Sequence, residues 1–113
     1  MPPDLFAGMR VRDFAAAKPW YEQLLGGAPS FSPHATEAAW ELAAHRWLFI
    51  VEDADNPGGA IQTVLVDDLD AQVGEIRSRG LEPTEVEAYS NGVRKVIFRD
   101  ADGNELGFSG QPD

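Results

Sequence analysis

The side chains of this sequence that could carry chemistry are few and widely spaced. His34 and His45 are the only imidazoles, and the chain has no cysteine. His34 stands beside Pro33 in an irregular stretch and His45 lies at a turn, so neither is spaced as part of a metal-ligand pair. The absence of cysteine excludes disulfides, thiolate metal sites and a cysteine nucleophile. Any chemistry must therefore use oxygen or nitrogen groups.

Carboxylates are the next candidates. Glu41 and Glu105 are the acids nearest the predicted strands, and a buried carboxylate can act as a general base without a metal. No partner residue is apparent for either of them. The Asp-x-Asp pairs at 53–55 and 100–102 lack the glutamate spacing of a calcium loop, so turn formation explains them better. The sequence also contains no Ser-His-Asp arrangement, phosphate-binding glycine loop or dinucleotide fingerprint, and we assign no catalytic residue.

Composition narrows the possible partners. The chain has 113 residues and a formal net charge of −10, which fits one small domain with an acidic surface. Its nine lysines and arginines are scattered, so we expect no nucleic-acid partner and no docking on anionic membranes. No apolar run approaches the ~20 residues that span a bilayer, and the first residues do not resemble a signal peptide. We expect a cytoplasmic protein.

The elements that must position these side chains begin with a strand over 5–11 and an amphipathic helix over 14–25. Asp13 is the expected helix cap, and Gly26 follows the last helical residue. Pro19 would remove a backbone hydrogen bond, so we expect a kink there or a helix that begins near Lys18. Two strands follow, over 36–43 and 46–52, and a segment rich in turn-forming residues over 52–59 forms a linker. After it we expect a strand over 60–66, a helix over 69–79, and strands near 81–86, 93–99 and 105–108.

The second half of the chain repeats the first. Val11-Arg12-Asp13 and Val66-Asp67-Asp68 hold equivalent places 55 residues apart (66 − 11). We therefore predict an α+β fold of two β-α-β-β-β modules, about 1–55 and 60–110, that form a curved mixed sheet, a cup, with the helices outside. A cup of this kind encloses a ligand cavity. A ferredoxin-like sandwich without a cavity is the alternative.

Three segments carry a family resemblance. Val11-Arg12-Asp13 followed by Trp20 through Gly26 resembles the signature of the vicinal oxygen chelate superfamily, which includes glyoxalases, bleomycin-resistance proteins and extradiol dioxygenases. The segment 66–80 resembles the start of its second module, and 98–104 resembles its last hairpin. Together they cover nearly the whole chain.

The resemblance implies a site for a divalent metal ion, with one ligand from each of four strands. The ligand positions fall on Phe6, Phe49, Ile61 and Gly107, and none of these residues can bind a metal. We therefore expect no metal and no other cofactor.

Alternation along the strands predicts which residues line the cup. Ala7, Met9 and Val11 form an apolar set that faces the helix. The residues that alternate with them along the strand therefore face the cavity. Lys95 and Arg99 are expected near its mouth, and Arg10 could hold an anionic group of a ligand. The predicted ligand-binding residues are Phe6, Arg10, Trp47, Phe49, Ile61, Thr63, Ile97 and Gly107.

The leading hypothesis is a metal-free protein that binds a small apolar or aromatic molecule, similar to bleomycin-resistance proteins that act by sequestration. The second is a glyoxalase- or dioxygenase-like enzyme that uses a divalent metal or a carboxylate base such as Glu41. The third is an interaction module whose cup is filled by its own side chains. Relatives of this size usually pair as dimers, with cups inside one chain or across two, so we expect a homodimer.

Overall fold

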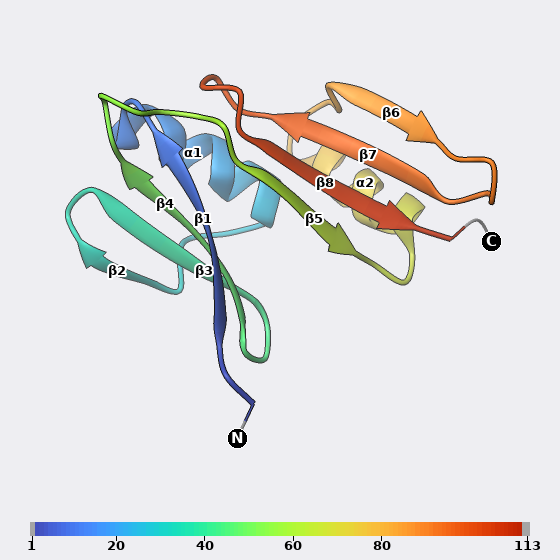
Figure 1. The fold of residues 1–113 in the computed structure, drawn as a ribbon, viewed down its shortest axis with the longest axis horizontal. Helices are drawn as coiled ribbons and strands as arrows, with labels where there is room; N and C mark the ends of the chain where they lie inside the picture. Colours follow the sequence, from blue (N-terminus) through green and yellow to red (C-terminus); the bar gives the residue numbers. More distant parts are fainter. Residues whose placement is uncertain (1, 112–113) are drawn as a thin grey trace.

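The computed structural model describes residues 2–111, which form two successive modules of the same design (Figure 1). The first module contains β1 (Leu5–Val11), α1 (Phe14–Leu25), β2 (Phe31–His34), β3 (Glu37–Ala43) and β4 (Arg46–Glu52). The second contains β5 (Ile61–Leu65), α2 (Leu69–Ser78), β6 (Glu85–Ala88), β7 (Arg94–Arg99) and β8 (Glu105–Gly110). This arrangement confirms the predicted α+β fold of two β-α-β-β-β modules.

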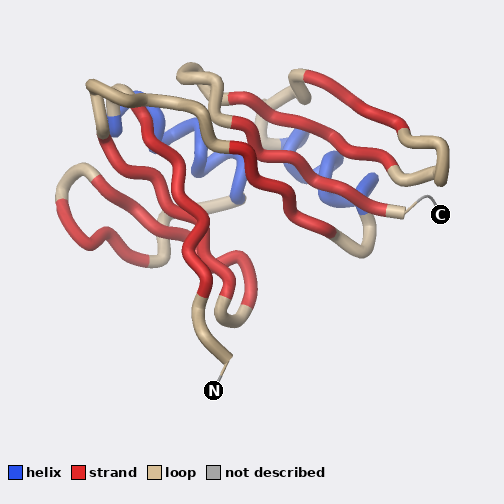
Figure 2. Tube along the Cα trace, in the orientation of Figure 1, coloured by secondary structure: helices blue, strands red, loops and turns tan. Residues whose placement is uncertain are grey.

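Each module folds as one four-stranded mixed sheet. The strand orders are β1-β4-β3-β2 and β5-β8-β7-β6, so they correspond strand for strand. The first strand of each module pairs in parallel with the last, and Gly8 opposite Phe49 corresponds to Thr63 opposite Gly107. The helices lie on one side of the sheets (Figure 2). The opposite face of each sheet, which we call the cup face, is left for other contacts.

The helices begin where the sequence predicts. Asp13 accepts a hydrogen bond from the Ala16 amide (3.2 Å), and in the second module Asp68 accepts one from the Ala71 amide (3.0 Å). These equivalent caps place both helices against their sheets in the same way. The alternative start near Lys18 is wrong, because α1 is continuous from Phe14 with Pro19 inside it. The carbonyl that Pro19 leaves without a helical partner belongs to Ala15, an exposed residue that water can reach.

Two strands differ from the prediction. β2 was not predicted because it is short, contains Pro33, and is exposed along its whole length. The strand after α2 was expected near 81–86, whereas β6 spans Glu85–Ala88. Leu81 packs as a partly buried residue against the core instead of extending the strand. Strands of this kind carry little hydrophobic alternation, which is the signal that sequence patterns supply.

One hydrophobic core connects the two modules. It lies between the sheets and the helices, and residues such as Val11, Leu24, Ile76 and Phe98 are almost completely buried in it. Met9 and Val11 face this core, as the alternation of β1 predicts. Polar contacts complete the connection between the modules at the end of β1, where Asn104 donates a hydrogen bond to the Arg10 carbonyl (2.7 Å).

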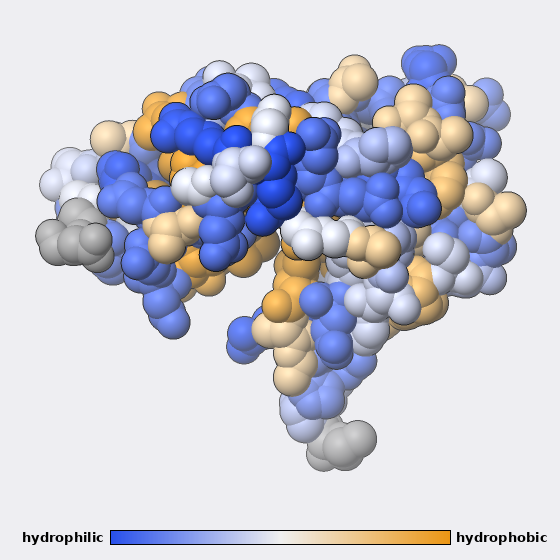
Figure 3. Space-filling view, turned by 180° about the vertical axis from the view of Figure 1, so that it is seen from behind, coloured by the Kyte–Doolittle hydropathy of each residue, from blue (hydrophilic) through white to orange (hydrophobic). Residues whose placement is uncertain are grey.

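The two sheets diverge away from this junction. Strands β1 and β5 are edge strands, and no ladder joins them in the part of the chain that the structure describes. A groove of about 880 Å³ lies between the modules, lined by Leu5, Ala7 and Leu48 on one side and by Val64 and Leu65 on the other. Seen from the helix side, a notch with hydrophobic residues inside it separates the two parts of the molecule (Figure 3). No helix within residues 2–111 is long and apolar enough to cross a membrane.

Candidate functional site

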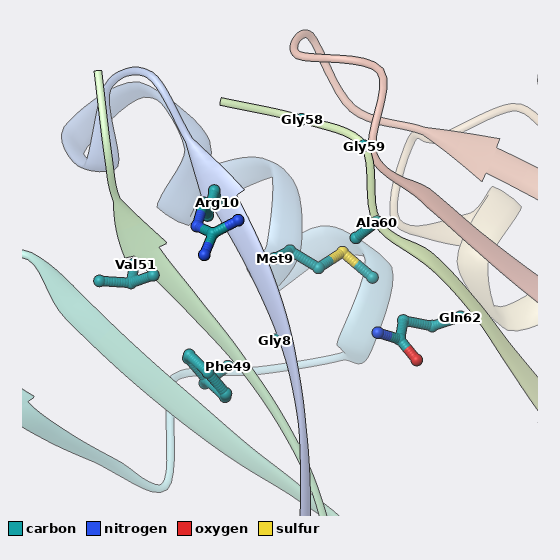
Figure 4. A pocket seen from close by; sticks show the side chains of 9 residues that line it. All are labelled: Gly8, Met9, Arg10, Phe49, Val51, Gly58, Gly59, Ala60 and Gln62. Carbon is teal, nitrogen blue, oxygen red and sulfur yellow. The ribbon is translucent and has the colours of Figure 1, made fainter. Parts of the chain in front are cut away.

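A pocket lies on the cup face of the first module, where β1 and β4 meet the linker. It has a volume of about 370 Å³, within the usual range for small-molecule sites. Gly8 and Arg10 contribute from β1, Phe49 and Val51 from β4 (Figure 4). The remaining lining residues are Met9, Gly58, Gly59, Ala60 and Gln62.

Phe49 forms the floor of this pocket because the facing residue has no side chain. A Cβ atom on Gly8 would lie 2.4 Å from Cζ of the Phe49 ring, so the ring occupies the space above the glycine. Phe49 and Gly8 are direct partners in the parallel β1–β4 ladder. The glycine thus gives the site an aromatic surface close to the backbone of β1.

Arg10 stands at the edge of the pocket with a counterion already in place. Its Nε lies 3.4 Å from Oδ2 of Asp53, a residue of the linker. The side chain is well exposed, so this ion pair is screened by solvent and contributes little to stability. A ligand anion at Arg10 would have to compete with Asp53.

The cup face of the second module is closed by its own charged side chains. The aliphatic stem of Lys95 covers Gly107, where an added Cβ would lie 2.4 Å from Cε of the lysine. Glu105 binds both the Lys95 ammonium (3.6 Å) and the Arg99 guanidinium (3.1 Å). Ile97 lies almost completely buried in the same strand as these two cations. The cup face of the second module is therefore covered by ion pairs, whereas the cup face of the first module has an open aromatic surface.

The structure divides the predicted ligand-binding residues among several places. Arg10 and Phe49 line the pocket, while Trp47 and Thr63 line the groove between the modules. Ile97 and Gly107 are buried, and Ile61 is exposed. Phe6 stacks on Trp47 on the cup face of the first module, with ring centroids 5.2 Å apart. The contribution of the linker glycines and Gln62 was not anticipated, since turn-forming residues give no signal for which side of a linker faces a cavity.

The four positions that the family resemblance assigns to a metal do not fit one. Phe6, Phe49, Ile61 and Gly107 offer no side-chain oxygen, nitrogen or sulfur donor, and divalent ions in proteins require such donors. Nor do residues 2–111 contain three His, Asp or Glu side chains grouped closely enough to hold an ion. The metal site that the family resemblance implies is therefore incompatible with the side chains that this chain has at the four positions.

The remaining polar candidates have other partners. His34 pairs with Glu37 (Nε2 to Oε1, 2.8 Å), and His45 pairs with Asp4 (Nδ1 to Oδ1, 2.5 Å). Glu41 is exposed on β3, and Glu105 is occupied by the lysine and arginine that flank it. Asp100 accepts hydrogen bonds from the backbone amides of Asp102 and Asn104, as expected of a turn residue.

The duplicated modules and the open cup face define the class of protein. A sequence profile of the Glyoxalase/Bleomycin resistance protein/Dioxygenase superfamily matches residues 5–108, and the chain belongs to this superfamily. No functionally curated protein matches it.

Solved structures resemble the chain over nearly its whole length. A glyoxalase/bleomycin resistance protein from Catenulispora acidiphila DSM 44928 is 49% identical, with a TM-score of 0.93 over 98% of this chain and 100% of that one. A bleomycin-binding protein complexed with bleomycin is 18% identical, with a TM-score of 0.75 over 99% and 100% of the two chains. A lactoylglutathione lyase from Agrobacterium tumefaciens is 20% identical, with a TM-score of 0.69 over 97% and 96%. The last two similarities concern the fold alone.

Proposed function

We propose that this chain is a metal-free protein that binds a small flat molecule, apolar or aromatic, on the cup face of its first module. The observation that carries the proposal is the pocket floored by Phe49, at a position where the family resemblance expects a metal ligand. An aromatic ring in place of a donor favours stacking and apolar contact over coordination. Membership of a superfamily whose name includes bleomycin resistance proteins agrees with a binding role.

The first test is native mass spectrometry of tag-free protein, since one spectrum reports bound metal, bound small molecules and the oligomer mass. We expect protein without a metal ion, with or without the mass of a retained organic molecule. One divalent ion per chain would contradict the proposal and favour a glyoxalase- or dioxygenase-like enzyme.

The second test measures binding of a neutral flat probe, 9-anthracenemethanol, by its fluorescence. Phe49→Asp should abolish binding, because it removes the aromatic ring on which the flat probe would stack and puts a charged carboxylate in its place. Ile61→Asp is the matched comparison, since Ile61 is exposed and lies outside the pocket of its own chain. Equal affinity of wild type and Phe49→Asp would contradict the placement of the site. Loss of binding in both variants would instead indicate a cup that includes the second module of another copy.

We also propose that a second copy of the chain covers the groove between the modules. Leu5 is 71% exposed and Leu65 79% exposed, and both lie on edge strands that border this apolar groove. Exposed apolar surface of this kind is typical of association sites. Leu65→Glu should convert a dimer into a monomer in sedimentation velocity, whereas Val86→Glu, at an exposed valine of β6, should leave the mass unchanged. A wild-type monomer would contradict the proposal.

A further inference from the structure

Three aromatic rings cluster on the cup face of the first module, beyond the pocket. Phe6 stacks on Trp47 at an interplanar angle of 10°, and the Phe31 ring meets Trp47 edge-on, with centroids 5.4 Å apart. Phe6 and Phe31 are each 44% exposed. We call these three residues, Phe6, Phe31 and Trp47, the aromatic shelf. Exposed rings grouped in this way are uncommon on a surface that contacts only water.

A carboxylate fixes the orientation of the shelf. The Trp47 indole donates a hydrogen bond to Oδ2 of Asp4 (3.0 Å), while Oδ1 of the same aspartate pairs with the His45 ring. These hydrogen bonds, the one with His45 first, lower the pKa of Asp4 below its ordinary value. Asp4 therefore carries a full negative charge at neutral pH, at the edge of the rings.

The backbone at His45 supports the same contact. His45 adopts φ = 65°, the one non-glycine residue with a positive φ among the described residues. Histidine, like asparagine and aspartate, is among the non-glycine residues found most often in this left-handed conformation. The turn brings the imidazole against Asp4, and the Leu5 amide donates to the His45 carbonyl (2.9 Å).

A second carboxylate flanks the shelf from β3. Glu41 lies directly opposite Trp47 in the antiparallel β3–β4 ladder, and residues directly opposite one another in a ladder share a face of the sheet. Its side chain is exposed, and neither an ion pair nor a side-chain hydrogen bond engages it within the described part of the chain. The rings thus lie between two acids, in a protein of net charge −10.

We propose that the aromatic shelf is a binding subsite for a planar aromatic cation. The faces of aromatic rings are electron-rich and attract cations that stack on them. The carboxylates of Asp4 and Glu41 complement the same charge, and the acidic surface raises the local concentration of cations. The shelf also continues into the pocket, because Phe6 and Gly8 lie on one face of β1, as Trp47 and Phe49 do on β4. The inference rests on the proposed function and names the chemical class of its ligand.

The experiment compares three flat tricyclic probes by fluorescence titration of the full chain: proflavine, a cation; 9-anthracenecarboxylate, an anion; and neutral 9-anthracenemethanol. We expect proflavine to bind with one site per chain and about tenfold more tightly than the anion. Trp47→Leu should weaken proflavine binding about tenfold, and Phe6→Leu provides a second test should the tryptophan variant fail to fold. Asp4→Asn and Glu41→Gln should each weaken it severalfold. Glu82→Gln, which removes a carboxylate from an exposed residue outside the first module, should leave it unchanged.

Equal affinity for the cation and the anion would overturn the inference, as would unchanged proflavine binding in both Trp47→Leu and Phe6→Leu. If the neutral probe binds and Phe49→Asp abolishes that binding while no preference for the cation appears, the proposed function holds and the shelf inference fails. If none of the three probes binds, both fail.

Discussion

The Tyr21 hydroxyl donates a hydrogen bond of 2.7 Å to Oδ2 of Asp100, and so connects α1 of the first module to the β7–β8 turn of the second. Tyr21 is almost completely buried, and its ring packs near Trp20 and Trp40. The carboxylate that it meets also accepts a hydrogen bond from the Asn104 side chain (2.9 Å). The two modules are therefore joined by a partly buried charge-assisted contact as well as by the shared core.

Removing this hydroxyl should destabilise the protein. Tyr21→Phe keeps the ring but deletes the donor, so we expect a loss of about 1.5–3 kcal/mol in the free energy of unfolding, the usual range for hydrogen bonds to charged groups. Urea denaturation followed by circular dichroism measures it. Tyr89→Phe removes a hydroxyl that binds Glu87 on the exposed surface and should cause no measurable change. Equal stability of wild type and Tyr21→Phe would show that the contact contributes nothing.

The same tyrosine should make stability sensitive to alkaline pH. Burial above all, and then the charge of Asp100, raise the pKa of Tyr21 well above its ordinary value. In the unfolded chain the phenol ionises near pH ~10, so its contribution is fully present below that pH and declines above it. Wild type should lose up to about 1.4 kcal/mol per pH unit relative to Tyr21→Phe above pH ~10. Denaturation curves of the two proteins at about pH 9, 10 and 11 give the comparison, and a constant difference would contradict the expectation.

Asn104 should be the least replaceable polar residue at the junction between the modules. Its buried side-chain amide donates to the Arg10 carbonyl and to Asp100, and its oxygen accepts from the Ala60 amide (3.1 Å). Asn104→Asp has nearly the same shape but loses both donors and places a second carboxylate against Asp100. We expect a loss of roughly 3 kcal/mol or more, because a buried charge is left without a partner.

Thermal unfolding at neutral pH and near pH ~4 tests the Asn104→Asp variant. Protonation of the introduced carboxyl group restores a hydrogen-bond donor at low pH, so the deficit relative to wild type should shrink there. A deficit that is the same at both pH values would mean that shape rather than charge causes it.

The fold could be predicted from the sequence because the residues that begin the helices recur at the same spacing in both halves of the chain. The caps at Asp13 and Asp68 are 55 residues apart (68 − 13), and the structure places them at equivalent helix starts. Alternation in β1 was equally clear, since Met9 and Val11 are apolar and face the core. The exposed strand β2 has no such alternation, and Pro19 misled the prediction of where α1 begins because a proline weakens a helix without necessarily ending it.

The candidate site was less predictable because it depends on how separate segments meet. The family resemblance indicated that Phe6 and Phe49 stand where metal ligands are expected, and alternation indicated that they share a face. Neither the resemblance nor the alternation could indicate that the Lys95 side chain covers Gly107, or that Asp4 accepts a hydrogen bond from the Trp47 indole. Such contacts join residues distant in the sequence, and their geometry follows from the packing of whole strands and not from local pattern.

The partnership of Gly8 and Phe49 provides the most direct test of the pocket. Gly8→Ala introduces a Cβ that would lie 2.4 Å from Cζ of the Phe49 ring, so the ring must turn into the cavity. Because the far end of a side chain can move, we expect a modest loss of about 1 kcal/mol in stability, together with much weaker binding of 9-anthracenemethanol. Gly8→Ala combined with Phe49→Leu should recover part of that affinity, since the smaller side chain leaves room for the new methyl group. Gly74→Ala, on α2 with open space around it, is the control and should bind the probe as wild type does. Unchanged affinity in Gly8→Ala would mean that the probe does not occupy the space above Phe49, and the pocket would lose its role as the ligand site.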